Sequence, residues 1–222
     1  MESREPELRV TTDGSHSLYH PVTDQLYHSH HGAVQESMHV FIKHGYECVA
    51  GSKDHIRILE IGFGTGLNAL LTQRMADDKT IYYESLEYYP ISANLAEQLN
   101  YPRDNNERTF FHALHNASWN TVEMLSPQFQ VRKRLLKIQD YVAQDASFDV
   151  IYFDAFSPSA QPELWSEKIF CAMYNSLNYN GVLVTYCSKG DVRRAMIAAG
   201  FSVEKLPGPP GKREMLRGIR MK

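Results

Sequence analysis

A run of alternate glycines near residue 60 has the clearest chemical content in the sequence. Residues 58–68 read ILEIGFGTGLN, so an apolar run leads into Gly62, Gly64 and Gly66. Glycine lets the backbone turn sharply and lets a ligand lie against the main chain, where a side chain would collide. Turns of this kind serve phosphates, dinucleotides and S-adenosylmethionine, so the glycines alone leave the ligand open.

Acidic residues around the turn favour S-adenosylmethionine over the phosphate-containing ligands. The turn lacks the Gly-Lys-Ser/Thr of a P-loop, and its Gly-x-Gly-x-Gly spacing differs from the Gly-x-Gly-x-x-Gly of dinucleotide sites. A carboxylate at Glu60, just before the turn, would repel a pyrophosphate but suits the cationic methionine part of S-adenosylmethionine.

Two further acids follow later predicted strands. Glu87, 21 residues after Gly66, is placed to accept both hydroxyls of an adenosine ribose, and Asp140 is placed to lie beside the adenine amino group. Each carboxylate taken alone is also explained as a solvated loop residue, but three at successive strand ends favour a ligand. The predicted cofactor contacts are Glu60, Gly62, Phe63, Gly64, Gly66, Asn68, Glu87 and Asp140.

A second chemical centre is predicted where residues 150–158 read VIYFDAFSP. Asp154 leaves an apolar run at the position where amine-directed methyltransferases carry Asp/Asn-Pro-Pro-Tyr. A carboxylate there can hold an alkylammonium, help to remove its proton and orient the nitrogen for in-line attack. Aromatic faces nearby suit an unstacked base, although Asp154 as a turn cap and Trp165 as a core residue remain the structural alternative. The predicted acceptor-side residues are Phe156, Ser157, Pro158 and Trp165.

These residues require a sheet whose strands alternate with helices. Strands are expected at residues 56–61, 80–86, 135–138, 150–153, 182–186, 201–206 and 214–219, and helices at 67–75, 91–99, 163–177 and 191–199. The alternation predicts an α/β, Rossmann-like class I methyltransferase fold, with helices on both faces of a mostly parallel sheet. The last two strands are too close for a crossover helix and should form a C-terminal antiparallel hairpin. Residues 101–133 are expected to be an insertion with some helix.

Length and composition indicate a globular chain of 222 residues, 43% hydrophobic and 22% charged. No apolar run approaches the length of a membrane span, and the charged N-terminus lacks a secretory signal. Three widely spaced cysteines, Cys48, Cys171 and Cys187, fit a reduced cytoplasm. We expect a cytoplasmic protein in which an N-terminal extension (residues 1–50) packs on a methyltransferase domain (residues 51–222).

Seven of the ten histidines lie in the first 50 residues. His28, His30 and His31 would suggest a metal site, but no ligand of suitable spacing completes it. We therefore expect no metal, and interpret this stretch as a polar loop that covers the cofactor.

Charge is distributed unevenly along the chain. The net charge is -3, from 23 Lys and Arg against 26 Asp and Glu, yet residues 189–222 contain nine basic and three acidic residues. A basic edge on an acidic body is expected where a protein meets a polyanion, although a solvated basic surface gives the same count.

Taken together, these motifs resemble the MnmC-like methyltransferase family. The resemblance rests on residues 61–68, on 153–158 with Pro162 and Trp165, on 211–216 and on an upstream segment near residues 27–41. It implies that S-adenosylmethionine is used to convert 5-aminomethyl-2-thiouridine at the tRNA wobble position to its 5-methylaminomethyl form. It also implies that Asp154 acts on the substrate amine and that Glu87 binds the ribose.

The resemblance implies two further expectations about partners. Many family members carry a fused FAD-dependent oxidase, whereas this sequence ends at Lys222, so a stand-alone methyltransferase is expected, with the oxidase activity supplied by a separate protein. Lys212 and Arg213, on the turn of the terminal hairpin, are hypothesised to hold the phosphates of the tRNA anticodon stem. A small-molecule N-methyltransferase and an inactive tRNA-binding module are the alternatives.

Overall fold

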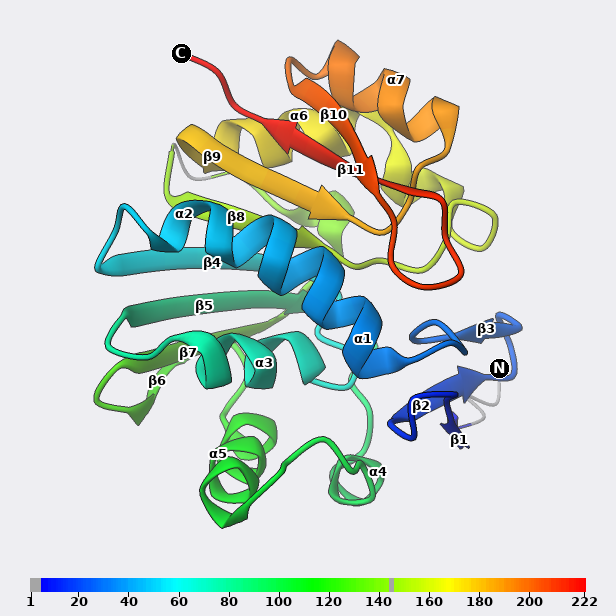
Figure 1. The fold of residues 1–222 in the computed structure, drawn as a ribbon, viewed down its shortest axis with the longest axis vertical. Coiled ribbons are helices and arrows are strands. Elements are labelled where there is room, and N and C mark those ends of the chain that lie inside the picture. Colours follow the sequence, from blue (N-terminus) through cyan, green and yellow to red (C-terminus); the bar gives the residue numbers. More distant parts are fainter. Residues whose placement is uncertain (1–4, 144–145) are drawn as a thin grey trace.

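The computed structural model describes residues 5–143 and 146–222, so residues 1–4 of the predicted N-terminal extension lie outside the described residues. Its largest element is a twisted sheet (Figure 1). The strands of this sheet are β4 (His55–Ile61), β5 (Thr80–Glu87), β6 (Val122–Ser126), β7 (Phe129–Leu135), β8 (Phe148–Phe153), β9 (Leu177–Thr185), β10 (Ser202–Pro207) and β11 (Glu214–Ile219).

Within the described residues these eight strands are arranged in the order β10-β11-β9-β8-β4-β5-β7-β6. The five inner strands from β9 to β7 run parallel, while β6 at one edge and the β10–β11 hairpin at the other run antiparallel to their neighbours. The predicted fold class, including the C-terminal antiparallel hairpin, is confirmed.

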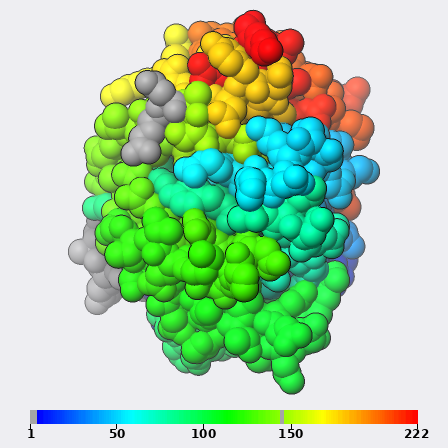
Figure 2. Space-filling view, turned by 90° about the vertical axis from the view of Figure 1, so that its left-hand side faces the viewer, coloured from blue at the N-terminus to red at the C-terminus, as the bar shows by residue number. Residues whose placement is uncertain are grey.

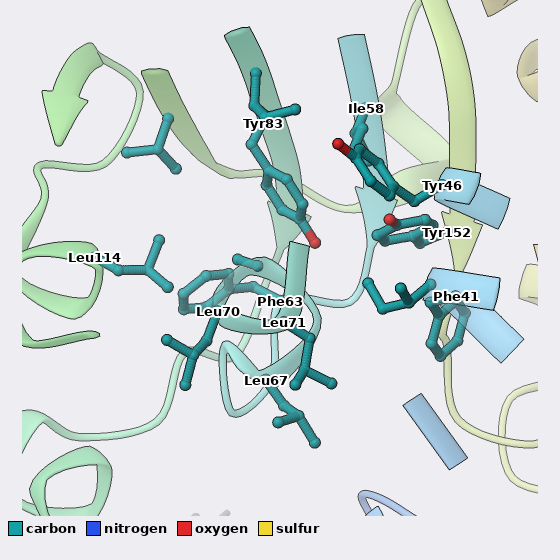
Figure 3. Close-up of a cluster of buried hydrophobic side chains, with 14 of the residues drawn as sticks. Phe41, Tyr46, Ile58, Phe63, Leu67, Leu70, Leu71, Tyr83, Leu114 and Tyr152 are labelled. Atoms are coloured by element: carbon teal, nitrogen blue, oxygen red, sulfur yellow. The ribbon is translucent and has the colours of Figure 1, made fainter. Parts of the chain in front are cut away.

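Successive side chains of the inner strands enter two separate cores, because neighbours along a strand point to opposite faces. Ile58 and Tyr152 belong to one core (Figure 3), whereas their neighbours Leu59 and Phe153 belong to the other. The first core is covered by α1 (Ala33–Ser37), the π-helix η1 (Met38–Tyr46), α2 (Glu47–Ala50), α3 (Leu67–Met75) and α5 (Asn105–Asn116). The second is covered by α6 (Glu167–Ser176) and α7 (Gly190–Ala198).

A small antiparallel sheet lies beside the carboxyl ends of the parallel strands (Figure 1). It is formed by β1 (Glu7–Val10), β2 (His16–His20) and β3 (Gln25–Leu26). The remaining short helices are α4 (Ala93–Glu97), η2 (Ile138–Asp140) and η3 (Pro162–Trp165). The side view of Figure 2 shows green segments in its lower part, cyan segments in the middle and yellow to red segments at the top.

One detail of the sequence prediction was wrong. The third strand was expected at residues 135–138, but β7 occupies Phe129–Leu135 and the 3-10 helix η2 follows it. The apolar alternation of β7 is hidden in the sequence because Lys133 takes an interior position. Its Nζ donates a 2.6 Å hydrogen bond to the His115 carbonyl oxygen. His28, His30 and His31, interpreted as part of a polar loop, lie in the irregular segment between β3 and α1. The helix expected within residues 101–133 is present as α5.

None of the helices in the described ranges is both long and apolar enough to span a bilayer.

Candidate active site

The strand order creates a crevice directly beyond β4. After β4 the chain adds β5 on one side and later returns to place β8 on the other side. The loops that follow β4 and β8 therefore diverge, and such a switch point is where open α/β sheets bind ligands. A cleft of about 1430 Å³ opens here, and the N-terminal sheet contributes to its wall. This volume exceeds the usual range for small-molecule sites, which leaves space for two ligands.

The glycine turn needs its glycines for backbone reasons. Gly62, Gly64 and Gly66 have φ values of 91°, 49° and 72°, which L side chains rarely adopt. A Cβ at Gly62 would also lie 2.8 Å from the Asp154 carbonyl oxygen, so the turn and the end of β8 touch through their main chains. Gly66 is the N-cap of α3. The sequence motif therefore produces a side-chain-free shelf at the head of the cleft.

Glu87, at the end of β5, lies across from this shelf and lines the cleft. Its Oε2 accepts a 3.1 Å hydrogen bond from the Gly64 backbone N–H, and its Oε1 accepts 2.7 Å bonds from the N–H groups of Tyr88 and Tyr89. Three backbone donors thus fix the carboxylate, and its position depends on β5 and on the turn together.

Asn68 joins the two acids at the centre of the site. Its Nδ2 donates to Glu60 Oε1 at 3.1 Å and to Asp154 Oδ2 at 2.9 Å. Burial raises the pKa of Glu60 to about 8, and the charge of Asp154 adds to this rise. Burial likewise raises the pKa of Asp154 to about 7, with the nearby Glu36 carboxylate contributing and the Asn68 hydrogen bond opposing. Asp154 lines the cleft, and its carboxyl group can change protonation near neutral pH.

An aromatic wall faces the cleft from the loop after β8. The Phe156 ring makes edge contacts with Tyr27 (ring centroids 5.1 Å apart) and His20 (6.1 Å). The Ser157 hydroxyl donates a 3.0 Å hydrogen bond to Gln25 Oε1. The N-terminal sheet is therefore attached directly to the wall of the cleft.

The cleft brings together most, but not all, of the predicted site residues. Those that line it are Gly62, Phe63, Gly64, Asn68, Glu87, Asp154, Phe156, Ser157 and Lys212. Those outside its lining are Glu60, Gly66, Asp140, Pro158, Trp165 and Arg213. Trp165 is only 5% exposed and its Nε1 donates to the Phe156 carbonyl oxygen, so it supports the aromatic wall from behind. Asp140 is exposed at the end of η2.

Three further residues line the cleft, although the sequence motifs give them no individual role: Glu36, Tyr27 and Tyr186. Tyr186 directly follows β9, so its place at the carboxyl end of a parallel strand was the available signal. Glu36 and Tyr27 come from the N-terminal segment, and no local pattern connects them to a cleft formed by residues far along the chain.

The basic C-terminal residues are mostly occupied by internal partners. Lys212 forms an ion pair with Glu36 at the cleft wall, so it is directed away from the surface role predicted for it. Arg217 pairs with Glu204 at 2.7 Å. Arg213 is exposed and forms no ion pair with any acid in the described part of the chain.

Over residues 5–143 and 146–222, no three His, Cys, Asp or Glu side chains are grouped as a metal site. His28 is buried, and burial lowers its pKa to about 4. Its ring lies 3.4 Å from the Ser17 hydroxyl and 3.5 Å from the Thr65 hydroxyl. His28 therefore links the N-terminal sheet to the glycine turn as a neutral side chain.

Several known proteins are similar to this chain. The protein "tRNA 5-methylaminomethyl-2-thiouridine biosynthesis bifunctional protein MnmC" of Aromatoleum aromaticum is 32% identical over 216 residues, which cover 87% of this chain and 32% of that protein. Its counterpart in Cupriavidus metallidurans is 30% identical over 235 residues, covering 97% and 34% respectively. The chain thus spans about a third of the length of these relatives.

The same fold is found in a solved structure, that of MNMC2 from Aquifex aeolicus. The two match with a TM-score of 0.81 and 23% sequence identity, over 99% of this chain and 72% of that chain. A family model described as S-adenosyl-L-methionine-dependent methyltransferase matches residues 110–221, half of the chain and the part that contains Asp154. The chain belongs to this family of S-adenosyl-L-methionine-dependent methyltransferases.

Proposed function

We propose that this chain methylates the amine of 5-aminomethyl-2-thiouridine at the tRNA wobble position, giving the 5-methylaminomethyl form. The names of the relatives support this substrate, since they refer to the biosynthesis of 5-methylaminomethyl-2-thiouridine in tRNA. The observation that carries the proposal is Asp154, a half-buried residue that lines the cleft and whose main chain touches the glycine turn. We also propose a cytoplasmic location, which follows from the proposed tRNA substrate.

The residues of the cleft fit the methyl donor. Gly62 and Gly64 have no room for a side chain, so their main chain forms an open shelf. The Glu87 carboxylate faces this shelf with hydrogen-bond acceptors suited to ribose hydroxyls. S-adenosyl-L-methionine supplies an electrophilic methyl group on a sulfonium centre when bound. Phe63 and Asn68 line the same part of the cleft and complete the proposed cofactor contacts.

Asp154 is proposed to prepare the acceptor nitrogen. An alkylamine is mostly protonated at neutral pH and then has no lone pair for attack. The carboxylate of Asp154 can bind the ammonium, accept its proton on an Oδ atom and direct the freed lone pair along the line of attack. A general base works best when its pKa is near the working pH, and the raised pKa of Asp154 meets that condition.

The aromatic wall is proposed to hold the uridine. Phe156 presents its ring to the cleft between Tyr27 and His20, where an unstacked pyrimidine can lie on it. Arg213, exposed on the hairpin turn, is the proposed phosphate contact to the anticodon stem.

The test is methylation of undermodified tRNA. Protein, S-adenosyl-L-methionine and tRNA carrying the aminomethyl group are incubated, and the wobble nucleosides are analysed by mass spectrometry. We expect a gain of one methyl group, and a rate about 10²–10⁴-fold lower for Asp154→Asn. The control Asp78→Asn, an exposed acid between α3 and β5, should keep the parent rate.

Two results would contradict the proposal. Binding of S-adenosyl-L-methionine by calorimetry without methylation of tRNA would favour a small-molecule acceptor. Absence of cofactor binding would favour an inactive tRNA-binding module.

A further inference from the structure

Lys212, on the turn between β10 and β11, is directed into the cleft. Its Nζ lies 2.6 Å from Glu36 Oε1 and 3.9 Å from the centroid of the Tyr186 ring. The Glu36 side chain is 7% exposed and that of Lys212 is 32% exposed, so water screens this ion pair only in part. A cation on an aromatic face beside a carboxylate is held by both contacts at once.

The partners of Lys212 are themselves fixed. Glu36 Oε2 accepts a 2.7 Å hydrogen bond from the Ser29 backbone N–H. The Tyr186 hydroxyl donates a 2.8 Å bond to the Ala155 carbonyl oxygen, next to Asp154. Three segments far apart in the sequence, the start of α1, the end of β9 and the hairpin turn, therefore meet at one ammonium group.

The hairpin turn is also held in place without Lys212. The His39 ring forms a 2.8 Å hydrogen bond with the Pro207 carbonyl oxygen, and β11 pairs with β9 along four residues. Gly211 lies so close to the His31 ring that a Cβ there would collide with it. Removing the Lys212 charge should therefore leave the turn docked.

Burial and the Glu36 carboxylate from α1 both disfavour a negative charge on Asp154. Glu60 from β4 shares its Asn68 hydrogen-bond donor. Burial, together with the charge of Asp154, in turn raises the pKa of Tyr83 from β5 and of Tyr186 from beyond β9, so both hydroxyls stay neutral. Lys212 acts in the opposite direction and lowers the pKa of Asp154.

The net charge at the cleft wall depends on Lys212. Since the pKa of Glu60 is about 8, this buried acid is mostly neutral at pH 7. Once Asp154 is ionised, Glu36, Asp154 and Lys212 leave one net negative charge, which suits one acceptor ammonium. Without the lysine, two carboxylates would share the wall, and one of them would tend to take up a proton.

We propose that Lys212 is a positioning residue for the methyl acceptor: held by Glu36 and Tyr186, its ammonium favours the anionic form of Asp154, which receives an alkylammonium. This inference rests on the proposed function, because it assumes that the acceptor is an amine. It assigns Lys212 to the chemistry of the cleft and leaves the phosphate contact to Arg213.

The experiment measures the titration of Asp154 in the protein alone. Urea denaturation between pH 4 and pH 9 gives the unfolding free energy of the parent and of several single variants, each with and without Asp154→Asn. The difference between the two proteins changes from the pKa of the unfolded chain up to the pKa in the fold, so the pH at which it levels off, here called the Asp154 step, reports the titration of Asp154 in the fold. The backgrounds are the parent, Lys212→Met, Lys212→Gln, Lys212→Arg and Glu36→Gln, with Lys205→Met as a control that removes an exposed lysine from the same hairpin.

Opposite shifts are expected for the two partners. Lys212→Met should move the Asp154 step to higher pH by roughly half a pH unit or more, and Glu36→Gln should move it to lower pH by a similar amount. Lys212→Arg and Lys205→Met should leave it in place. Lys212→Gln keeps a polar side chain, and it carries the test if the methionine variant does not fold.

Steps that stay in place, or that move in the same direction for Lys212→Gln and Glu36→Gln, would overturn the role of Lys212. Neither tRNA nor cofactor enters this measurement, so a failure of the proposed function is recorded separately by the methylation assay. If the tRNA is methylated, the acid limb of kcat/KM should shift in the same sense as the Asp154 step.

Discussion

Replacing Asp154 with asparagine should stabilise the protein at neutral pH while it removes activity. The ordinary pKa of this carboxyl group is 3.8, and burial in the fold raises it to about 7. Between these two values the folded state keeps a proton that the unfolded chain has released. The unfolding free energy therefore falls as the pH rises from about 4 to 7, and above pH 7 the loss is complete.

The magnitude follows from the two pKa values. One pKa unit corresponds to about 1.4 kcal/mol, so the shift costs at most about 4 kcal/mol of unfolding free energy at pH 8. Water in the cleft reaches part of the carboxylate and reduces this figure. Asparagine carries no charge, and its side-chain oxygen can still accept the Asn68 hydrogen bond. The variant should therefore be more stable than the parent by about 2–4 kcal/mol at pH 8 and similar to it at pH 4.

Thermal and urea unfolding of the parent and of Asp154→Asn between pH 4 and pH 8 would measure this difference. We expect the gap in unfolding free energy to open between pH 4 and 7, and the Tm of the variant to lie several degrees higher at pH 8. Asp78→Asn, at an exposed carboxyl group, should show no such opening. A gap that is constant with pH, or a variant less stable than the parent at pH 8, would refute the reasoning.

Three more predictions follow from the site. Glu87→Ala should weaken S-adenosyl-L-methionine binding about ten- to a hundredfold by calorimetry, because charge-assisted bonds to the ribose are lost; an unchanged affinity would remove Glu87 from the cofactor site. Gly62→Ala should lower the unfolding free energy by about 1–3 kcal/mol, since its φ is 91° and the Asp154 carbonyl oxygen lies 2.8 Å from the added Cβ; parent-like stability in urea would show that the turn can relax. Arg213→Ala should weaken tRNA binding and reduce the slope of log K against log salt by about one, with Lys205→Ala as the matched hairpin control; equal slopes for both variants would mean that Arg213 contacts no phosphate.

The sequence alone was sufficient to predict those features of the cleft that depend on a short stretch of chain. The alternate glycines after β4 require a backbone conformation and a close approach that few other residues allow, so the turn could be recognised without its surroundings. Glu87 and Asp154 each end a strand, and the carboxyl ends of parallel strands share one edge of a sheet. Predicting the strands was therefore enough to predict that these acids meet at the cleft.

Burial was decided by tertiary structure, and it changed the roles of several predicted residues. Trp165 appeared suited to stack on a base, but η3 turns it into the second core. Lysine side chains usually lie at the surface, yet β7 directs Lys133 inward to the His115 carbonyl oxygen, and burial lowers its pKa to about 8. Residue type sets what a side chain can do, whereas its exposure depends on which elements cover it.

The contact between Lys212 and Glu36 shows most clearly what only the folded chain determines. The two residues are 176 positions apart, and no periodicity or motif links an N-terminal helix to a C-terminal hairpin. They meet because β11 inserts next to β9 and η1 packs against β9 and β11, which brings α1 and the hairpin turn to the same wall of the cleft. A charge count along the sequence assigns Lys212 to a basic edge, but three-dimensional proximity pairs it with a buried acid beside Asp154.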